Sequence, residues 1–207
     1  MENIQIQESF HDIGFHGPFI MSVLTITQLL NKGGTAYSLV YLFGYFVNKQ
    51  LNETLKLLFK SPRPEPMDML KQQQHDLFGW FHRWMSGSSV GDNKIYIPRA
   101  HIYGMPSGHA QSAGYSLAFF YMVFYKTIHE SRKITVVLLF WILMVAIDCI
   151  VLWQRWAYKA HTVAQLAMGN LIGIVFACIL VSFVKKYLQL SLYAYTRKPH
   201  KLMTDFT

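Results

Sequence analysis

Residues 134–153, ITVVLLFWILMVAIDCIVLW, and residues 164–184, AQLAMGNLIGIVFACILVSFV, decide the fold of this chain. Each stretch is close to the length of about 20 apolar residues that an α-helix needs to cross a bilayer. The first contains a single charged residue, Asp148, and the second contains none. A helix on the surface of a soluble protein would carry a polar face. Both stretches therefore predict membrane-spanning helices, and we disfavour the competing interpretation of buried helices in a large soluble core.

Three further apolar stretches precede these two, at residues 14–30, 35–59 and 107–125. The first is the weakest candidate for a span because it is short and contains Pro18. The turn Asn31-Lys32-Gly33-Gly34 makes the first two an antiparallel pair. We expect one all-α domain over residues 1–207, a polytopic membrane helix bundle with about five transmembrane helices and a motif-bearing core at residues 52–186.

One long polar segment, residues 61–105, separates the second apolar stretch from the third. Within it, apolar residues recur at helical spacing, namely Leu77, Phe78, Phe81, Trp84 and Met85. This pattern predicts a short helix lying in the membrane interface. A loop helix that packs on the protein is equally consistent with it.

The composition agrees with a membrane protein. Charged residues make up 14% of the chain, whereas soluble domains carry about 25%. The net charge of +8 suits either nucleic acid or anionic lipid. Several basic residues stand at the ends of apolar stretches rather than along one helix face, which favours a lipid bilayer as the partner and no nucleic acid.

Polar residues in a membrane protein are costly and usually functional, and three polar clusters stand out. Because successive spans alternate in direction, the end of the second span, the start of the third and the junction of the last two must share one side. The clusters at these places are Lys56 with Arg63-Pro64, then Pro106-Ser107-Gly108-His109, then Arg155 with His161.

The chemistry of the clusters points to a phosphate group. The first and third supply three positive charges, and arginine binds phosphate oxygens in bidentate fashion. The second opens a helix whose first N–H groups favour an anion. His109 and His161 can act as acid and nucleophile. No carboxylate cluster with metal-ligand spacing accompanies them, so we expect no catalytic metal and no cofactor.

These clusters, in this order and spacing, resemble the three-part signature of the type-2 phosphatidic-acid-phosphatase superfamily. The resemblance spans residues 56–169 and implies a metal-independent lipid phosphatase. His161 would attack phosphorus and form a phosphohistidine, and His109 would protonate the leaving oxygen. The phosphoryl oxygens would be held by Lys56, Arg63, Ser107, the Gly108 amide and Arg155.

The chain departs from the family pattern at two supporting positions. Gln154 stands where the family usually has Ser, and Gln165 stands where it usually has an Asp that orients the nucleophile. Gln165 follows His161 by four residues, so its side chain can accept a ring N–H from His161 across one helical turn if the last helix has begun by His161. A catalytically degenerate membrane protein that keeps the fold is therefore an alternative.

A narrower resemblance favours activity. His161-Thr162-x-x-Gln165, with Asn52-Glu53-x-Leu55-Lys56 and His109-Ala110-Gln111, is similar to the dolichyldiphosphatase branch, which carries Gln at the same place. It implies a polyprenyl diphosphate as substrate and the endoplasmic reticulum membrane as location. A phosphatidate-type phosphomonoesterase is the alternative within the superfamily. A related haloperoxidase is disfavoured because those enzymes are soluble.

Basic residues near the spans suggest the orientation. Arg132-Lys133 and Lys185-Lys186 stand on the side opposite the three clusters. Because basic residues beside spans favour the cytoplasm, we expect the clusters to face the lumen or exterior.

Overall fold

The computed structural model describes the backbone of residues 2–32, 34–64, 89–91, 94–96, 102–130 and 134–187. It describes side chains at residues 14–32, 34–64, 102–125 and 136–187. These residues form five long helices, α1 (Glu2–Asn31), α2 (Thr35–Phe59), α5 (Gly108–Glu130), α6 (Ile134–Ala157) and α7 (Val163–Tyr187). An antiparallel hairpin joins β1 (Ser89–Gly91) to β2 (Lys94–Tyr96). The predicted helical architecture is confirmed for the described residues, apart from this hairpin, which the sequence did not predict.

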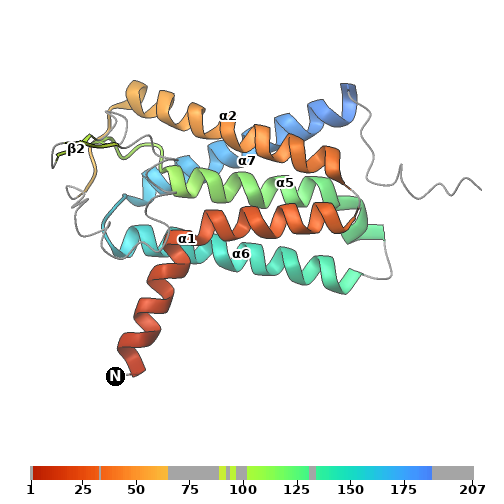
Figure 1. Ribbon diagram of the computed structural model, residues 1–207, viewed down its shortest axis with the longest axis horizontal. Helices are drawn as coiled ribbons and strands as arrows, with labels where there is room; N and C mark the ends of the chain where they lie inside the picture. Colours follow the sequence, from red (N-terminus) through yellow and green to blue (C-terminus); the bar gives the residue numbers. More distant parts are fainter. Residues whose placement is uncertain are drawn as a thin grey trace, which may run out of the picture.

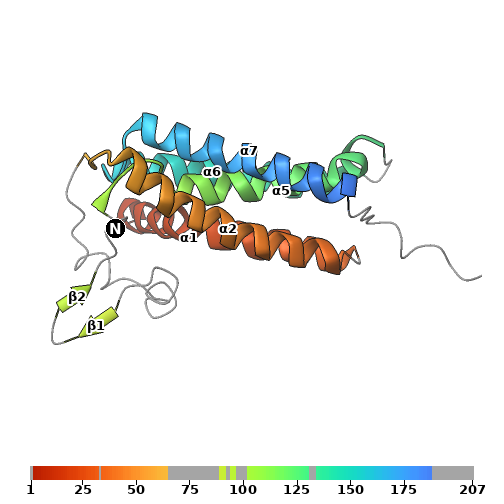
Figure 2. The same cartoon turned by 90° about the horizontal axis from the view of Figure 1, so that it is seen from above.

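The five helices lie side by side and alternate in direction (Figure 1 and Figure 2). Helix α5 packs against the four others, and most extensively against α7. Two glycines one turn apart on α7 allow this close approach. A Cβ on Gly169 would lie 2.5 Å from the main-chain oxygen of Ser107, and one on Gly173 would collide with the main-chain oxygen of Gln111. Small residues serve the same purpose at helix interfaces within membranes.

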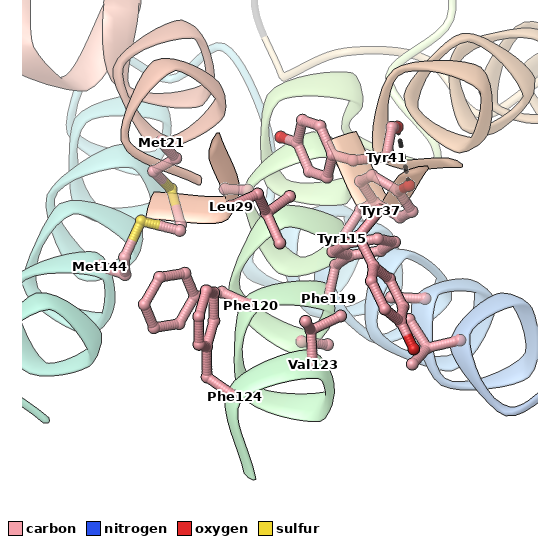
Figure 3. Packing of buried hydrophobic residues seen from close by; sticks show 14 of the residues in the cluster. Met21, Leu29, Tyr37, Tyr41, Tyr115, Phe119, Phe120, Val123, Phe124 and Met144 are labelled. Carbon is pink, nitrogen blue, oxygen red and sulfur yellow. Dashed lines mark hydrogen bonds between the residues drawn. The ribbon is translucent and has the colours of Figure 1, made fainter. Parts of the chain in front are cut away.

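The core consists mainly of the aromatic side chains of α5 and their neighbours. Figure 3 shows Phe120 of α5 between Met21 of α1 and Met144 of α6 on one side and the tyrosines of α2 on the other. The Tyr41 hydroxyl lies 2.8 Å from Ser22 Oγ of α1 and 2.7 Å from Ser116 Oγ of α5. Packing and hydrogen bonds thus fix the relative positions of the helices that carry the site.

Helix α1 is longer than the sequence predicted. It begins at Glu2 rather than near residue 14, since the polar residues before the apolar stretch continue the same helix. It changes direction part-way along its length (Figure 1). Pro18 lies inside it and has no N–H for the carbonyl of Gly14, which accounts for the bend.

The other boundaries are close to those predicted. Helix α2 covers residues 35–59 as expected, and α5, α6 and α7 each run three to five residues further than the apolar stretches that predicted them. The predicted interfacial helix at residues 77–85 lies outside the described residues.

Two helices in the described part of the chain are long and apolar enough to cross a membrane, over Val136–Ala157 and Val163–Tyr187. Their outward faces carry large exposed apolar side chains, among them Leu139, Ile142, Leu171, Ile179 and Phe183. The core helix of a soluble protein would bury such residues. The count of five transmembrane helices remains a prediction.

Candidate active site

The three polar clusters meet at one end of the helix bundle. The C-terminal ends of α2 and α6 and the N-terminal ends of α5 and α7 lie together at the left of Figure 1. Lys56 lies in the last turn of α2, and Arg155 lies in the last turn of α6. The alternation of helix direction therefore brings together segments that are about a hundred residues apart, as expected from the sequence.

His161 lies in the short connection between α6 and α7 and is only 2% exposed. Its Nδ1 is 2.9 Å from the main-chain oxygen of Gly104, and its Nε2 is 3.3 Å from Nη1 of Arg63. A carbonyl oxygen can only accept a hydrogen bond, so Nδ1 must carry the ring proton. In the neutral ring Nε2 is then unprotonated, and its lone pair faces the guanidinium group of Arg63.

The surroundings of His161 keep its imidazole neutral. Burial contributes most to lowering its pKa, and together with the charges of Arg155, Arg63 and Lys56 it brings the pKa to about 2, although the Gly104 hydrogen bond opposes the shift. Burial also lowers the pKa of Arg63, to about 10, so this guanidinium remains charged at neutral pH. The site therefore pairs an unprotonated imidazole nitrogen with fixed positive charge.

Three polar atoms in this region are buried and have no hydrogen-bond partner, namely Ser107 Oγ, Gln154 Oε1 and Arg155 Nε. An unsatisfied buried donor costs about 1–3 kcal/mol, and in a native protein such a group calls for a functional explanation. Lys56 and Arg155 are themselves only 5% and 4% exposed. Nζ of Lys56 is 3.8 Å from the position that a Cβ on Gly108 would take, at the start of α5. Buried cations beside unsatisfied donors suit an oxyanion as ligand.

His109 lies in the first turn of α5 and is half-buried. Its ring centroid is 5.6 Å from that of Phe15, and Cζ of Arg155 lies 6.0 Å from the centroid of the same phenyl ring. Phe15 of α1 thus contacts two of the predicted site residues. The sequence does not indicate this role, because nothing distinguishes Phe15 from a lipid-facing phenylalanine until α1 is placed against α6.

Gln154, predicted as a supporting residue, packs beneath α1. A side chain on Gly14 would collide with its Cβ, and its Oε1 is buried without a hydrogen-bond partner. The residue therefore lies beside Arg155 at the contact between α1 and α6.

The predicted contact between Gln165 and His161 is wrong. Oε1 of Gln165 accepts from the Thr162 N–H at 3.1 Å, and its Nε2 lies 3.1 Å from Ser61 Oγ and 2.8 Å from the Pro62 carbonyl oxygen. The prediction failed because it placed both residues on one helix. Helix α7 begins at Val163, so His161 precedes it and the spacing of one helical turn does not apply.

An amide network one turn below Lys56 joins α2 to α5. Asn52 Nδ2 donates to Gln111 Oε1 at 2.8 Å and to the Pro106 carbonyl at 3.2 Å. Gln111 Nε2 donates to the side-chain oxygen of Asn48 at 2.9 Å. These bonds fix the end of α2 against the start of α5, and with it the position of the lysine ammonium.

In the part of the chain that the structure describes, no three His, Cys, Asp or Glu side chains are grouped so that they could hold a metal ion. The described site is instead cationic.

Comparison with known families agrees with the geometry. The model of the PAP2 superfamily matches residues 35–189, a range that runs from the start of α2 to just beyond α7 and includes all three clusters. No curated protein and no solved structure matches the chain. Since the match covers well over half of its length, the chain belongs to the PAP2 superfamily, the type-2 phosphatidic acid phosphatases.

Proposed function

We propose that this chain is a multi-pass membrane phosphatase that hydrolyses a polyprenyl diphosphate of the dolichyl type, without a metal, through a phosphohistidine on His161. The observation that carries the proposal is the unprotonated Nε2 of His161, buried beside Arg63 among the charges of Lys56 and Arg155. A nucleophile surrounded by fixed cations suits an anionic electrophile such as a phosphoryl group.

In the first step, the Nε2 lone pair of His161 forms a bond to phosphorus while the bond from phosphorus to the leaving oxygen breaks. His109 gives its proton to that oxygen. The three cations, the Ser107 hydroxyl and the Gly108 N–H stabilise the charge on the equatorial oxygens. The imidazole gains positive charge, which its Nδ1–H shares with the Gly104 carbonyl.

In the second step, water attacks phosphorus and loses a proton to His109. The N–P bond breaks, inorganic phosphate leaves, and the electron pair returns to Nε2. Both histidines are then in their starting protonation states.

The bundle supports a membrane position for the site. Helix α5 packs alongside the two helices that are apolar enough to span, and α1 and α2 are at least as long as α5. If α6 and α7 cross the bilayer, their neighbours cross with them. Lys185 and Lys186 end α7 at the opposite end of the bundle from His161, which favours a lumenal site by the positive-inside rule.

The group that binds Nδ1 of His161 is an uncharged carbonyl, and this favours a diphosphate over a phosphate monoester as the substrate. The leaving group of a diphosphate is already a good one, so its reaction needs less help from a charged residue behind the imidazole. In this protein the group behind the imidazole is the uncharged main-chain carbonyl of Gly104. The similarity of Asn52, Gln111 and Gln165 to the dolichyldiphosphatase branch points the same way.

The test is phosphate release by the detergent-purified protein from dolichyl diphosphate, farnesyl diphosphate and phosphatidate, with EDTA present. We expect the polyprenyl diphosphate to give the highest kcat/KM. Highest activity on phosphatidate would make the chain a monoesterase, and a strict requirement for Mg²⁺ would contradict the metal-free site. No release from any lipid, with the protein folded, would favour the degenerate alternative.

A further inference from the structure

Two short segments next to His161 pair with each other like strands. The N–H of Gly104 donates to the Ser61 carbonyl at 2.8 Å, and Pro62 forms a β-bridge with Tyr103. The segment at residues 61–62 directly precedes Arg63, whose guanidinium contacts Nε2 of His161. The segment at residues 103–104 provides the carbonyl that binds Nδ1. The position of this pairing therefore sets both polar contacts of the imidazole.

The Gln165 side chain binds to both sides of the pairing. Its Nε2 donates to Ser61 Oγ and to the Pro62 carbonyl on one segment. On the other segment it packs directly over Gly104, where a Cβ would lie 2.6 Å from its Oε1. Its own carbonyl accepts from the Ser107 N–H at 3.1 Å, and its Oε1 accepts from the Thr162 N–H. One residue thus connects the loops that carry all three clusters.

We propose, resting on the function above, that Gln165 is a positioning residue that acts through Gly104. Its amide cross-links the loops so that the Gly104 carbonyl holds His161 with the proton on Nδ1 and Nε2 unprotonated. The chain thereby orients its nucleophile with a neutral main-chain acceptor, and among the described residues no carboxylate forms a hydrogen bond or ion pair with the ring.

This role requires an amide of this length. The Nε2 group donates to two acceptors, and a carboxylate can donate to neither. Glutamate would place an oxygen against the Pro62 carbonyl. Aspartate would in addition be one methylene too short to reach Ser61. Gln165→Asp is therefore expected to lose activity, although it places a carboxylate near the nucleophile.

Gly104 offers an independent way to disturb the same contact. Its backbone dihedral φ is not in the left-handed region, so alanine is not strained there, and the obstacle to a Cβ is the Gln165 side chain. Gly104→Ala should therefore impair the enzyme by displacing Gln165. In the double variant Gly104→Ala/Gln165→Ala, the shortened side chain at position 165 leaves room for the methyl group of Ala at position 104. The effects of the two single substitutions on activity should therefore be far from additive.

The first measurement is the tautomer of His161 in protein labelled with ¹⁵N-histidine, assigned by loss of its signal in His161→Asn. We expect Nδ1 protonated and Nε2 bare in the wild type, and a mixture of tautomers in Gln165→Met and Gly104→Ala. A wild-type ring protonated on Nε2 would overturn the proposal, as would an unchanged tautomer in both variants. This experiment needs no substrate, so it decides the inference even if the proposed phosphatase function fails.

The second measurement is steady-state kinetics on the best lipid substrate. Gln165→Met, Gln165→Glu and Gln165→Asp should each lower kcat by about tenfold to a hundredfold, with KM changed much less. The matched control is Gln28→Met. Gln28 is also a buried glutamine, and it lies near the C-terminal end of α1, away from the candidate site. The control should keep wild-type kcat. Wild-type kcat in the Gln165→Met and Gln165→Asp variants would contradict the positioning role.

Discussion

His161 combines two properties that rarely occur together, deep burial and proximity to three positive charges. Both disfavour its protonated form, which keeps a lone pair on the ring for the nucleophilic role that we propose across the physiological pH range. If kcat/KM is plotted against pH, a fall in activity at acidic pH should therefore come from a group other than His161 of the free enzyme. Its Nδ1 is bound to the Gly104 carbonyl, so Nε2 is the atom to which we assign the attack on phosphorus.

The depressed pKa of His161 predicts how stability depends on pH. Below about pH 6.5, the ordinary pKa of histidine, the unfolded chain binds a proton at this residue and the folded chain does not. Acidification from pH 7.5 to 5.5 should therefore lower the free energy of unfolding, and His161→Asn should remove that part of the loss. Thermal unfolding in detergent at the two pH values checks this. An equal loss in both proteins would show that His161 titrates normally.

The unpaired Nε of Arg155 predicts that lysine cannot replace this arginine. Lysine lacks both the Nε–H and the planar group that binds phosphate in bidentate fashion. Arg155→Lys should lower kcat/KM by about a hundredfold to a thousandfold, the size of losing one transition-state donor. Lys159→Arg is a control at the same end of the molecule, since Lys159 is exposed. A wild-type rate in Arg155→Lys would show that the guanidinium does not bind the phosphoryl group.

At the scale of the elements, α1 is the unexpected contributor to the site. It lies outside the family match, which begins at residue 35, yet its Phe15 contacts Arg155 and His109. Glycines at positions 14 and 17 let α1 approach the end of α6 closely enough for this. The residues matched by the family model therefore do not include every residue that contacts the candidate site.

Phe15→Ala should lower kcat/KM by about tenfold, because a cation–π contact of a desolvated guanidinium contributes up to about 2 kcal/mol. The matched control is Phe19→Ala, one turn further along α1, where the phenylalanine is 47% exposed. Equal effects of the two substitutions would show that Phe15 only stabilises the helix. Kinetics on the same lipid substrate check both variants.

The elements that the sequence predicts well are those encoded locally. The apolar stretches gave the positions of α2, α5, α6 and α7, and the alternation of spans brought Lys56, His109 and His161 to one end. The contacts of Gln165, Gly104 and Phe15 could not be read in the same way. A main-chain carbonyl that accepts a hydrogen bond from an imidazole is not recognisable in the sequence, because every residue has such a carbonyl. The contacts of Gln165 depend on α7 beginning two residues after His161.

On the scale of the whole molecule, the bundle has a cationic end, which carries the candidate site, and an apolar outer surface. Large exposed apolar side chains also line α2, including Leu39, Phe43 and Phe46. A bilayer around this surface would place the lipid chain of the substrate beside the helices and its phosphate at the cationic end.

Topology can be tested with single cysteines in a protein whose Cys149 and Cys178 are replaced. Tyr158 is exposed at the cationic end of the bundle, and Tyr187 is exposed at the opposite end, where α7 ends. In sealed vesicles of known orientation, an impermeant thiol reagent should label Tyr158→Cys from the lumenal side and Tyr187→Cys from the cytoplasmic side. Labelling of both from the same side would contradict the spanning bundle, and the reverse pattern would invert its orientation.

The central claim is that His161 becomes phosphorylated during turnover. The most direct test is to mix the protein with polyprenyl diphosphate labelled with ³²P in its terminal phosphate and to stop the reaction in alkaline detergent, in which phosphohistidine survives. We predict that label attaches to the wild-type protein in a peptide containing His161, and that His161→Asn acquires none. Release of labelled phosphate without a labelled protein, or equal labelling of the His161→Asn variant, would contradict the account.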